Sequence, residues 1–282
     1  MFFDRLPGAG YVCAHRGARA LAPENTMLAF ELALELGADY WETDVHKAAD
    51  GTLVVFHDDV LSRTSNIARQ SEFAHRAPWP TWSFTLEELR RLDVGSWFVD
   101  EDPYGTIAAG SGDPALIKRM KGLSIPTLDQ ALAFSKQKSF PVNIEIKDQT
   151  QLPGDLSIVG DVLQAVHEHE AEDLVLISSF NHDYLAEMHR LAPRIPLAVL
   201  VEDTPPDNVV SYLRALGADT YHPDRNLIDA ECVRALGKQG IRVAPWTVND
   251  MAEALSLVEA GCFGIITDYT HVLRRLLTER GG

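Results

Sequence analysis

The sequence predicts an α/β protein with the (β/α)8 architecture of a TIM barrel. Short apolar runs of strand type alternate with amphipathic helical patterns along all 282 residues, and this alternation is typical of a parallel sheet covered by helices. The chain length also fits one barrel, since such domains run to about 250 residues. A doubly wound open sheet is the alternative, but HRGARALAPENT, rather than G-x-G-x-x-G, follows the first expected strand.

Eight strands follow from the apolar runs, and the helices between them follow from their spacing. We expect strands at 11–14, 39–45, 141–147, 173–179, 196–201, 218–222, 241–247 and 263–267. In TMLAFELALELG, Leu28, Leu32 and Leu36 recur every four residues, as on the buried face of a helix. Glycines that suit a helix end precede several strands: Gly37, Gly217, Gly240 and Gly261. The last helix is expected at about 270–279.

The connection after the second strand breaks this rhythm. A short run at 53–57 follows the turn at Asp50-Gly51 and predicts a hairpin. Residues 61–122 then form a connection far longer than the usual length of about 4–6 residues. We therefore predict a single domain, 1–282, in which 61–122 is an insertion over the active-site face. A structural buttress unrelated to substrate is the alternative.

The insertion carries signals of partial folding. It holds three of the five tryptophans (Trp79, Trp82 and Trp97). Thr85-Leu86-Glu87-Glu88 is a capping box that predicts a short helix through Leu92. The acidic, glycine-rich stretch 100–115 is expected to be a mobile surface loop.

Composition and charge exclude some classes of function. A formal net charge of −16 argues against nucleic acid, because binding a polyanion needs a basic track. No run approaches the roughly 20 apolar residues of a membrane span, and the start of the chain leaves no room for a signal peptide. Cys13, Cys232 and Cys262 lie in apolar contexts, as expected in a reducing compartment. We therefore expect a cytoplasmic protein; its oligomeric state stays open.

Carboxylates alternate along two of the predicted strands. Glu42 and Asp44 share one face of the second strand, and Asn143, Glu145 and Lys147 share one face of the next. Inward-facing residues near the carboxyl ends of barrel strands converge on the active site. Three such carboxylates repel one another unless they are protonated, paired or bound to a metal. All-oxygen ligation suits Mg²⁺, Ca²⁺ or Mn²⁺ better than Zn²⁺.

A purely structural role for these charges is the alternative. In that case Arg16 and Lys147 would pair with the carboxylates in a buried network. Buried ion pairs barely compensate for the cost of their desolvation. Stability alone therefore does not account for five charged residues there, and we favour a divalent cation site.

Two histidines each follow a strand-like run and each precede a charged residue. These are His15 before Arg16 and His57 before Asp58. An imidazole can act as acid and as base near neutral pH. Cleavage of an unactivated phosphate ester needs both roles, because the attacking oxygen loses a proton and the departing alkoxide gains one.

Several motifs in order closely resemble the glycerophosphodiester phosphodiesterases. They are HRG at 15–17, PENT at 23–26, ETD at 42–44, DGTLVVFHDDVLSRTS at 50–65, IPTLDQAL at 125–132, NIEIK at 143–147, SSF at 178–180, WTVN at 246–249 and GIITD at 264–268. The resemblance spans nearly the whole chain, although Thr270 stands where a proline is expected. It implies a TIM barrel with an insertion after the second strand.

The resemblance also implies roles for individual residues. His15 and His57 would be the acid–base pair, and Glu42, Asp44 and Glu145 would hold one divalent cation, Mg²⁺ or Ca²⁺, with Mn²⁺ also possible. Arg16 and Lys147 would bind the phosphate, and Trp246 would contact the glycerol side of the substrate. His222 and Phe180 are further candidates for the pocket wall, and Asp58 is a candidate to orient His57.

The expected activity is hydrolysis of a small glycerophosphodiester to glycerol 3-phosphate and an alcohol. Lysophospholipase D-like cleavage of lysophospholipids is the alternative within the same chemistry. A Schiff-base aldolase that uses Lys147 is another enzyme class to consider. A non-catalytic sensor of phosphate esters is a further alternative, but it would be expected to lack at least one ligand or histidine, and all are present.

Overall fold

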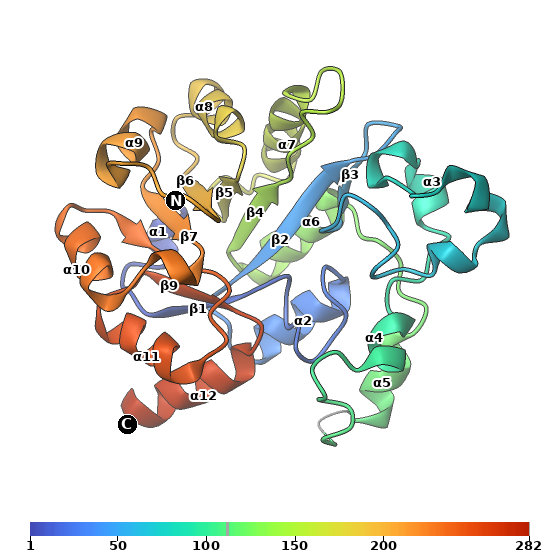
Figure 1. The fold of residues 1–282 in the computed structure, drawn as a ribbon, viewed down its shortest axis with the longest axis horizontal. Coiled ribbons are helices and arrows are strands. Elements are labelled where there is room, and N and C mark those ends of the chain that lie inside the picture. Colours follow the sequence, from blue (N-terminus) through green and yellow to red (C-terminus); the bar gives the residue numbers. More distant parts are fainter. Residues whose placement is uncertain (111–112, 282) are drawn as a thin grey trace.

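The computed structural model describes residues 1–110 and 113–281, and its centre is a parallel β-barrel (Figure 1). The sheet order is β8-β7-β6-β5-β4-β2-β1-β9, with β3 paired to β2 outside this path. The strands are β1 (Tyr11–Ala14), β2 (Tyr40–Lys47), β3 (Leu53–Val55), β4 (Val142–Ile146), β5 (Val175–Ser179), β6 (Leu197–Val201), β7 (Thr220–Pro223), β8 (Arg242–Val243) and β9 (Gly264–Thr267).

The sheet closes nearly into a full barrel. Single backbone hydrogen bonds join the two end strands: Phe263 N–H donates to Val243 at 2.8 Å, and Ile266 N–H donates to Pro245 at 3.1 Å. The predicted (β/α)8 barrel is therefore confirmed. β8 covers only Arg242–Val243 of the strand expected at 241–247, although Ala244 N–H and Trp246 N–H still donate to Tyr221 and Pro223 of β7 at 2.9 and 3.0 Å.

The predicted hairpin after the second strand is also present. β3 runs antiparallel to β2, with Val45 opposite Val55. It starts at Leu53 as expected but ends at Val55, so that His57 lies two residues beyond the strand.

Helices surround the barrel (Figure 1). They are α1 (Phe2–Arg5), α2 (Met27–Glu35), α6 (Leu128–Lys138), α7 (Ser157–Glu168), α8 (His182–Leu191), α9 (Val209–Leu216), α10 (Ala230–Lys238), α11 (Met251–Glu259) and α12 (Thr270–Gly281). Side-chain caps start several of them; for example, the hydroxyl of Thr26 accepts a hydrogen bond from Ala29 N–H at the start of α2.

The barrel wall separates two sets of side chains. Trp41 on β2 faces outward and packs against Phe30 of α2, with ring centroids 4.0 Å apart, in the large cluster between strands and helices. Because successive strand residues point to opposite faces, Glu42 and Asp44 face the interior of the barrel. At the amino end of the strands, Phe2 of α1 packs against Tyr40 and helps to close the interior. α1 was not predicted, because four residues are too few for a periodic pattern.

The insertion at 61–122 has short helices, and its apolar side chains cluster with Val54 of β3 and with the nearby Ala48 and Phe56. Its elements are η1 (Ile67–Arg69), η2 (Ser71–Arg76), η3 (Thr81–Ser83), α3 (Leu86–Leu89), α4 (Ser96–Glu101) and α5 (Pro114–Met120). The capping box at Thr85 is confirmed, but α3 ends at Leu89 instead of Leu92. Within the loop expected at 100–115, residues 111 and 112 lie outside the described part of the chain. Figure 1 shows the insertion beside the barrel, next to β3 and α2.

Two further observations bear on the expectations from composition. Cys13, Cys232 and Cys262 are all free thiols; Cys13 and Cys262 are buried, whereas Cys232 is only partly buried, although burial was expected for all three. Among the described helices, none has the length and apolar character that a bilayer crossing requires.

Candidate active site

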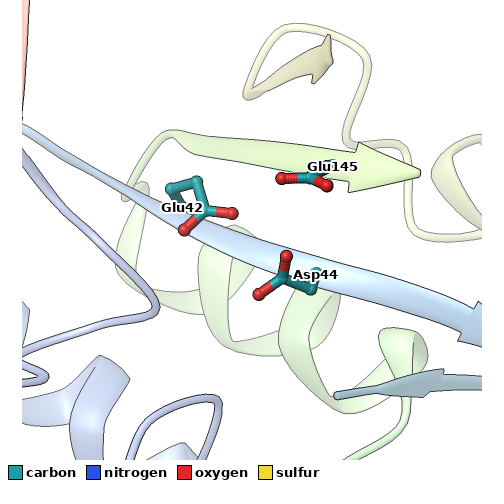
Figure 2. A group of neighbouring side chains, drawn as sticks. All are labelled: Glu42, Asp44 and Glu145. Carbon is teal, nitrogen blue, oxygen red and sulfur yellow. The ribbon is translucent and has the colours of Figure 1, made fainter. Parts of the chain in front are cut away.

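Three carboxylates meet inside the carboxyl end of the barrel (Figure 2). The parallel register places Asp44 of β2 beside Glu145 of β4, and Glu42 lies one inward-facing position earlier on β2. Each residue offers an oxygen atom, and these atoms lie within 4.8 Å of one another. The three residues are only 4%, 1% and 8% exposed, respectively. The structure thus brings together the three residues that the strand alternation predicted to converge.

The pKa values of the three carboxylates are shifted in different directions. Burial, followed by repulsion from Asp44 and Glu145, raises the pKa of Glu42 well above its usual value. Burial also raises the pKa of Glu145, although Lys147 opposes this. Burial would raise the pKa of Asp44 as well, but His57, Lys147 and Arg16 together hold it below its usual range. Without a cation, the cluster therefore tends to retain protons on its glutamates.

Arg16 and Lys147 bring positive charge to the cluster. The Arg16 Nε lies 3.4 Å from Asp44, and the Arg16 backbone N–H donates to Glu42 at 2.9 Å. The Lys147 Nζ lies 2.7 Å from Glu145 and 3.5 Å from Asp44. Burial would lower the pKa of Lys147, but the two carboxylates raise it above its usual value. A charged ammonium cannot act as a nucleophile, so this environment does not suit a Schiff-base aldolase.

The loop after β1 has a strained backbone that fixes Arg16. Arg16 has a positive φ of 52°, a conformation that costs about 1–3 kcal/mol for a residue with a side chain. Gly17 follows with a φ of 82°, and a Cβ there would lie 2.7 Å from Ala29 of α2. The turn therefore requires glycine at position 17, whereas Arg16 adopts its conformation at a cost.

His15 and His57 are held in the same way. The Nδ1 of His15 lies 2.7 Å from Asp268, and the Nδ1 of His57 lies 2.5 Å from Asp58. A carboxylate at Nδ1 selects the tautomer that leaves Nε2 free. Both histidines line one pocket together with Arg16, Glu42, Asn143, Glu145, Ser178, Phe180, Leu200, Trp246 and Ile266. Both imidazoles therefore belong to the pocket that Glu42 and Glu145 also line, whereas Asp44 lies beside these two carboxylates without lining the pocket.

The predicted residues differ in how they contribute to this pocket. Trp246 lines it, with its ring edge-to-face against Phe180 at 5.3 Å and its Nε1 donating to the carbonyl of His222. His222 itself is fully buried and is not among the lining residues. Lys147 reaches the carboxylates without lining the pocket.

Burial has a strong effect on His15. It lowers the pKa of this imidazole to about 4, with Arg16 acting in the same direction and Asp268 opposing it. His15 is therefore neutral at pH 7 and can accept a proton there.

Sequence reasoning missed several residues that hold this site together. Asn25 donates to Asp44 at 2.7 Å and accepts from the Thr43 hydroxyl at 2.8 Å. Asp268 accepts from the Asn249 side chain at 2.8 Å, in addition to its contact with His15. Asn25 and Asp268 fall within the PENT and GIITD motifs, so their position in these motifs was the available signal.

A larger hollow of about 560 Å³ lies in the insertion, between η1 and α4. It is lined by polar residues such as Arg63, Asn66 and Asp93 and contains none of the predicted site residues. We place the chemistry in the smaller pocket, because the convergent carboxylates and imidazoles are there.

His222 leads to a prediction about stability. The side chain is 0% exposed, and neither ring nitrogen has a hydrogen-bond partner among the described residues. Burial lowers its pKa to about 3. Below about pH 6.5 the unfolded chain therefore takes up a proton that the folded protein does not. The free energy of unfolding consequently decreases as the pH is lowered.

We expect His222→Leu to weaken this acid sensitivity. At pH 5 the wild-type imidazole costs about 2 kcal/mol relative to neutral pH. Between pH 7.5 and pH 5.0 the melting temperature of the variant should therefore fall by roughly 5 °C less than that of the wild type, as measured by calorimetry. The exposed His75 gives a matched control, since His75→Leu should not change the difference. An equal fall in wild type and His222→Leu would contradict the expectation.

The fold and this site define the class of the protein. It is a (β/α)8-barrel enzyme whose centre combines an acidic cluster suited to a divalent cation with two oriented imidazoles. Comparison with known proteins identifies the family. The model of the glycerophosphoryl diester phosphodiesterase family matches residues 15–272.

Individual relatives agree with this match. A glycerophosphodiester phosphodiesterase of Caldanaerobacter subterraneus subsp. tengcongensis is 35% identical over 273 residues, which cover 96% of this chain and 98% of the relative. A crystal structure from Silicibacter pomeroyi has a TM-score of 0.84 at 25% identity, covering 99% of this chain and 97% of that one. An Oleispira antarctica phosphodiesterase in complex with the product sn-glycerol-3-phosphate has a TM-score of 0.79 at 27% identity, covering 95% and 96%.

The chain belongs to the glycerophosphoryl diester phosphodiesterase family, and it is a phosphodiesterase. The predicted family is thereby confirmed. The names of these relatives do not favour the alternative of a lysophospholipid substrate.

Proposed function

We propose that this protein hydrolyses a small glycerophosphodiester to glycerol 3-phosphate and an alcohol, with one divalent cation and two histidines. The observation that carries the proposal is a single pocket lined by two imidazoles together with Glu42 and Glu145, beside which Asp44 completes a cluster of three carboxylates. The net charge of −16 supports a small diester over a nucleic acid. The three free cysteines support a cytoplasmic location, where thiols stay reduced.

The carboxylates fit a hard divalent cation. Asp44 Oδ1 and Glu145 Oε1 are buried without a hydrogen-bond partner among the described residues, although Lys147 provides ionic contacts to both. Oxygen ligands of this kind suit Mg²⁺ or Ca²⁺, with Mn²⁺ also possible. Glu42, Asp44 and Glu145 would hold the ion, which when bound supplies Lewis-acid stabilisation of charge on the phosphoryl oxygens.

The side chains around the cluster would perform the remaining steps. Arg16 and Lys147 bind and orient the phosphate and stabilise its added charge in the transition state. Of the two imidazoles, the neutral His15 is suited to accept the proton of the attacking oxygen, and His57, entering the reaction with a proton on Nε2 as well as on Nδ1, donates the Nε2 proton to the departing alkoxide. Trp246 contacts the glycerol side of the substrate. The insertion 61–122 borders the active-site face through Arg63, which reaches Asp58.

A turnover screen tests the proposal. The enzyme is treated with EDTA, and Mg²⁺, Ca²⁺ and Mn²⁺ are added back separately. Glycerophosphocholine, glycerophosphoethanolamine and lysophosphatidylcholine are offered in parallel, and the released choline or ethanolamine is measured, with glycerol 3-phosphate as a second product of the first two substrates. We expect EDTA to abolish turnover and at least one ion to restore cleavage of a glycerophosphodiester.

Two outcomes would contradict the proposal. Full activity in EDTA would remove the cation from the mechanism, and no cleavage with any ion would remove the assigned substrate class. Preferential cleavage of lysophosphatidylcholine would instead support the lysophospholipase D-like alternative.

A separate experiment tests the Schiff-base aldolase alternative. Borohydride treatment in the presence of a carbonyl compound should leave Lys147 unmodified.

A further inference from the structure

Three guanidinium groups converge on one buried carboxylate, that of Glu24. Arg16 Nη1 donates to it at 2.7 Å, Arg19 Nε at 2.9 Å and Arg63 Nη2 at 2.7 Å. Glu24 is only 6% exposed. A second hydrogen bond from Arg63 Nη1, at 3.1 Å, makes that contact bidentate, which fixes direction as well as distance. Glu24 does not line the catalytic pocket.

One contact leads from Glu24 to His57. The Arg63 Nε and Nη2 donate to the two oxygens of Asp58 at 2.6 and 2.8 Å, and Asp58 in turn holds the Nδ1 of His57. Among the described residues, Arg63 provides the only guanidinium contact to Asp58. Arg63 therefore fixes the carboxylate that orients His57, and Glu24 fixes Arg63.

A second contact leads from Glu24 to His15. Arg19 Nη1 lies 3.4 Å from Asp268, the partner of His15, and also 3.4 Å from the Nδ1 of His15. Asp268 has additional support from the Asn249 side chain at 2.8 Å. This connection is therefore longer and less exclusive than the connection to His57.

Apart from Asp44, which Arg16 also contacts, the network is balanced in charge. It contains three carboxylates, Glu24, Asp58 and Asp268, and three guanidiniums, Arg16, Arg19 and Arg63. Burial would raise the pKa of Glu24, but the surrounding arginines, Arg16 first, lower it below its usual range. Loss of the central charge would leave a partly buried excess of positive charge, which is costly unless the arginines move.

We propose that Glu24 is a positioning residue that sets the two imidazoles relative to each other, through Arg63 and Asp58 on one side and Arg19 and Asp268 on the other. Its effect on rate rests on the proposed function, whereas its effect on the imidazoles does not. The connection to His57 passes through Arg63, so one end of the inserted segment 61–122 takes part in the geometry of the site.

Nuclear magnetic resonance of ¹⁵N-histidine-labelled, EDTA-treated protein tests the positions directly. Spectra of His15→Asn and His57→Asn assign the two signals. We expect Glu24→Gln to shift both signals, with the larger shift at His57. The reason is that Asp58 depends on Arg63 alone, whereas Asp268 also accepts a hydrogen bond from Asn249. Arg63→Gln should shift only the His57 signal, and Arg19→Gln only the His15 signal.

Kinetics on the metal-loaded enzyme provide the second readout. Residues that orient a catalytic group typically cost 10–100-fold when replaced, so we expect kcat of Glu24→Gln to fall by about that factor. Arg63→Gln should lower kcat and leave KM nearly unchanged, since Arg63 acts on proton transfer rather than on substrate binding. The matched control is Arg119→Gln, which breaks an exposed ion pair between α5 and Glu31 of α2 and should change neither kcat nor the histidine signals.

The outcomes separate this inference from the proposed function. Unshifted histidine signals in folded Glu24→Gln would overturn it, and so would equal shifts of both signals in Arg63→Gln. If Glu24→Gln does not fold, the histidine signals of Arg63→Gln and Arg19→Gln test the inference in its place. If the wild-type enzyme cleaves no diester, the proposed function fails while the histidine spectra still test the role of Glu24.

Discussion

His15→Asn and His57→Asn should each lower kcat by about 10²–10⁴-fold, the usual cost of removing a general acid or base. Asparagine is the informative replacement, because its amide can still donate to Asp268 or Asp58 while nothing replaces the Nε2 that faces the pocket. The cation site should remain intact in both variants. Steady-state kinetics with a glycerophosphodiester, together with a metal titration, check both expectations.

A change of leaving group should distinguish the two roles. 4-Nitrophenolate departs without a proton, so a 4-nitrophenyl ester of glycerol phosphate bypasses the general acid. We expect His57→Asn to recover much of its rate with this ester and His15→Asn to recover little, because the neutral His15 is suited to accept a proton. The reverse pattern would exchange the two assignments.

The exposed His75 gives the control, since His75→Asn should retain full activity. Wild-type turnover in either active-site variant, with the cation bound normally, would remove that histidine from the mechanism.

The sequence was sufficient to predict where Glu42, Asp44 and Glu145 would meet. Their spacing of two residues fixes a common face in any strand, and a closed parallel barrel directs that face inward at one end. The prediction needed no loop conformation, and for this reason it matches the structure. The same holds for the outward-facing Trp41, which packs against Phe30 as a residue of opposite parity should.

The contacts between loops could not be predicted in this way. Asp268 lies 253 positions after His15 in the sequence, and the chain has 41 acidic residues that could have been its partner. Likewise, Arg63 reaches Glu24 only because the connection after β3 folds back toward the loop after β1. Such pairings depend on the paths of irregular segments, for which residue spacing gives no periodic signal.

Glu42→Gln should have two effects of opposite sign: a large loss of activity and a gain in the stability of the metal-free protein. A cation contributes several kcal/mol of transition-state stabilisation, so we expect kcat to fall by about 10²–10⁴-fold. In EDTA at pH 8, the melting temperature of the variant should lie above that of the wild type. Kinetics and calorimetry on the same preparations provide both measurements.

The sign of the stability effect follows from the pKa of Glu42. Burial and the neighbouring carboxylates raise this pKa well above its usual value, so in the unfolded chain the side chain loses its proton at lower pH than in the folded protein. Above about pH 4.3, the ordinary pKa of a glutamate, folding therefore becomes less favourable as pH rises, until the folded pKa is reached. Glutamine has the same shape, can still accept from the Arg16 N–H, and does not titrate, so its advantage should vanish below pH 4.

Addition of Mg²⁺, Ca²⁺ or Mn²⁺ reverses the comparison. Ligand binding stabilises the folded state in proportion to its affinity, so the wild type should gain melting temperature with the ion that activates it, and Glu42→Gln should gain little. The exposed Glu87 serves as control, since Glu87→Gln should change neither the stability in EDTA nor the response to the ion. A lower melting temperature of Glu42→Gln in EDTA would mean that the charge of Glu42 stabilises the fold without a cation. In that case Arg16 and Lys147 would suffice to neutralise the cluster, and the carboxylates would no longer require a metal ion.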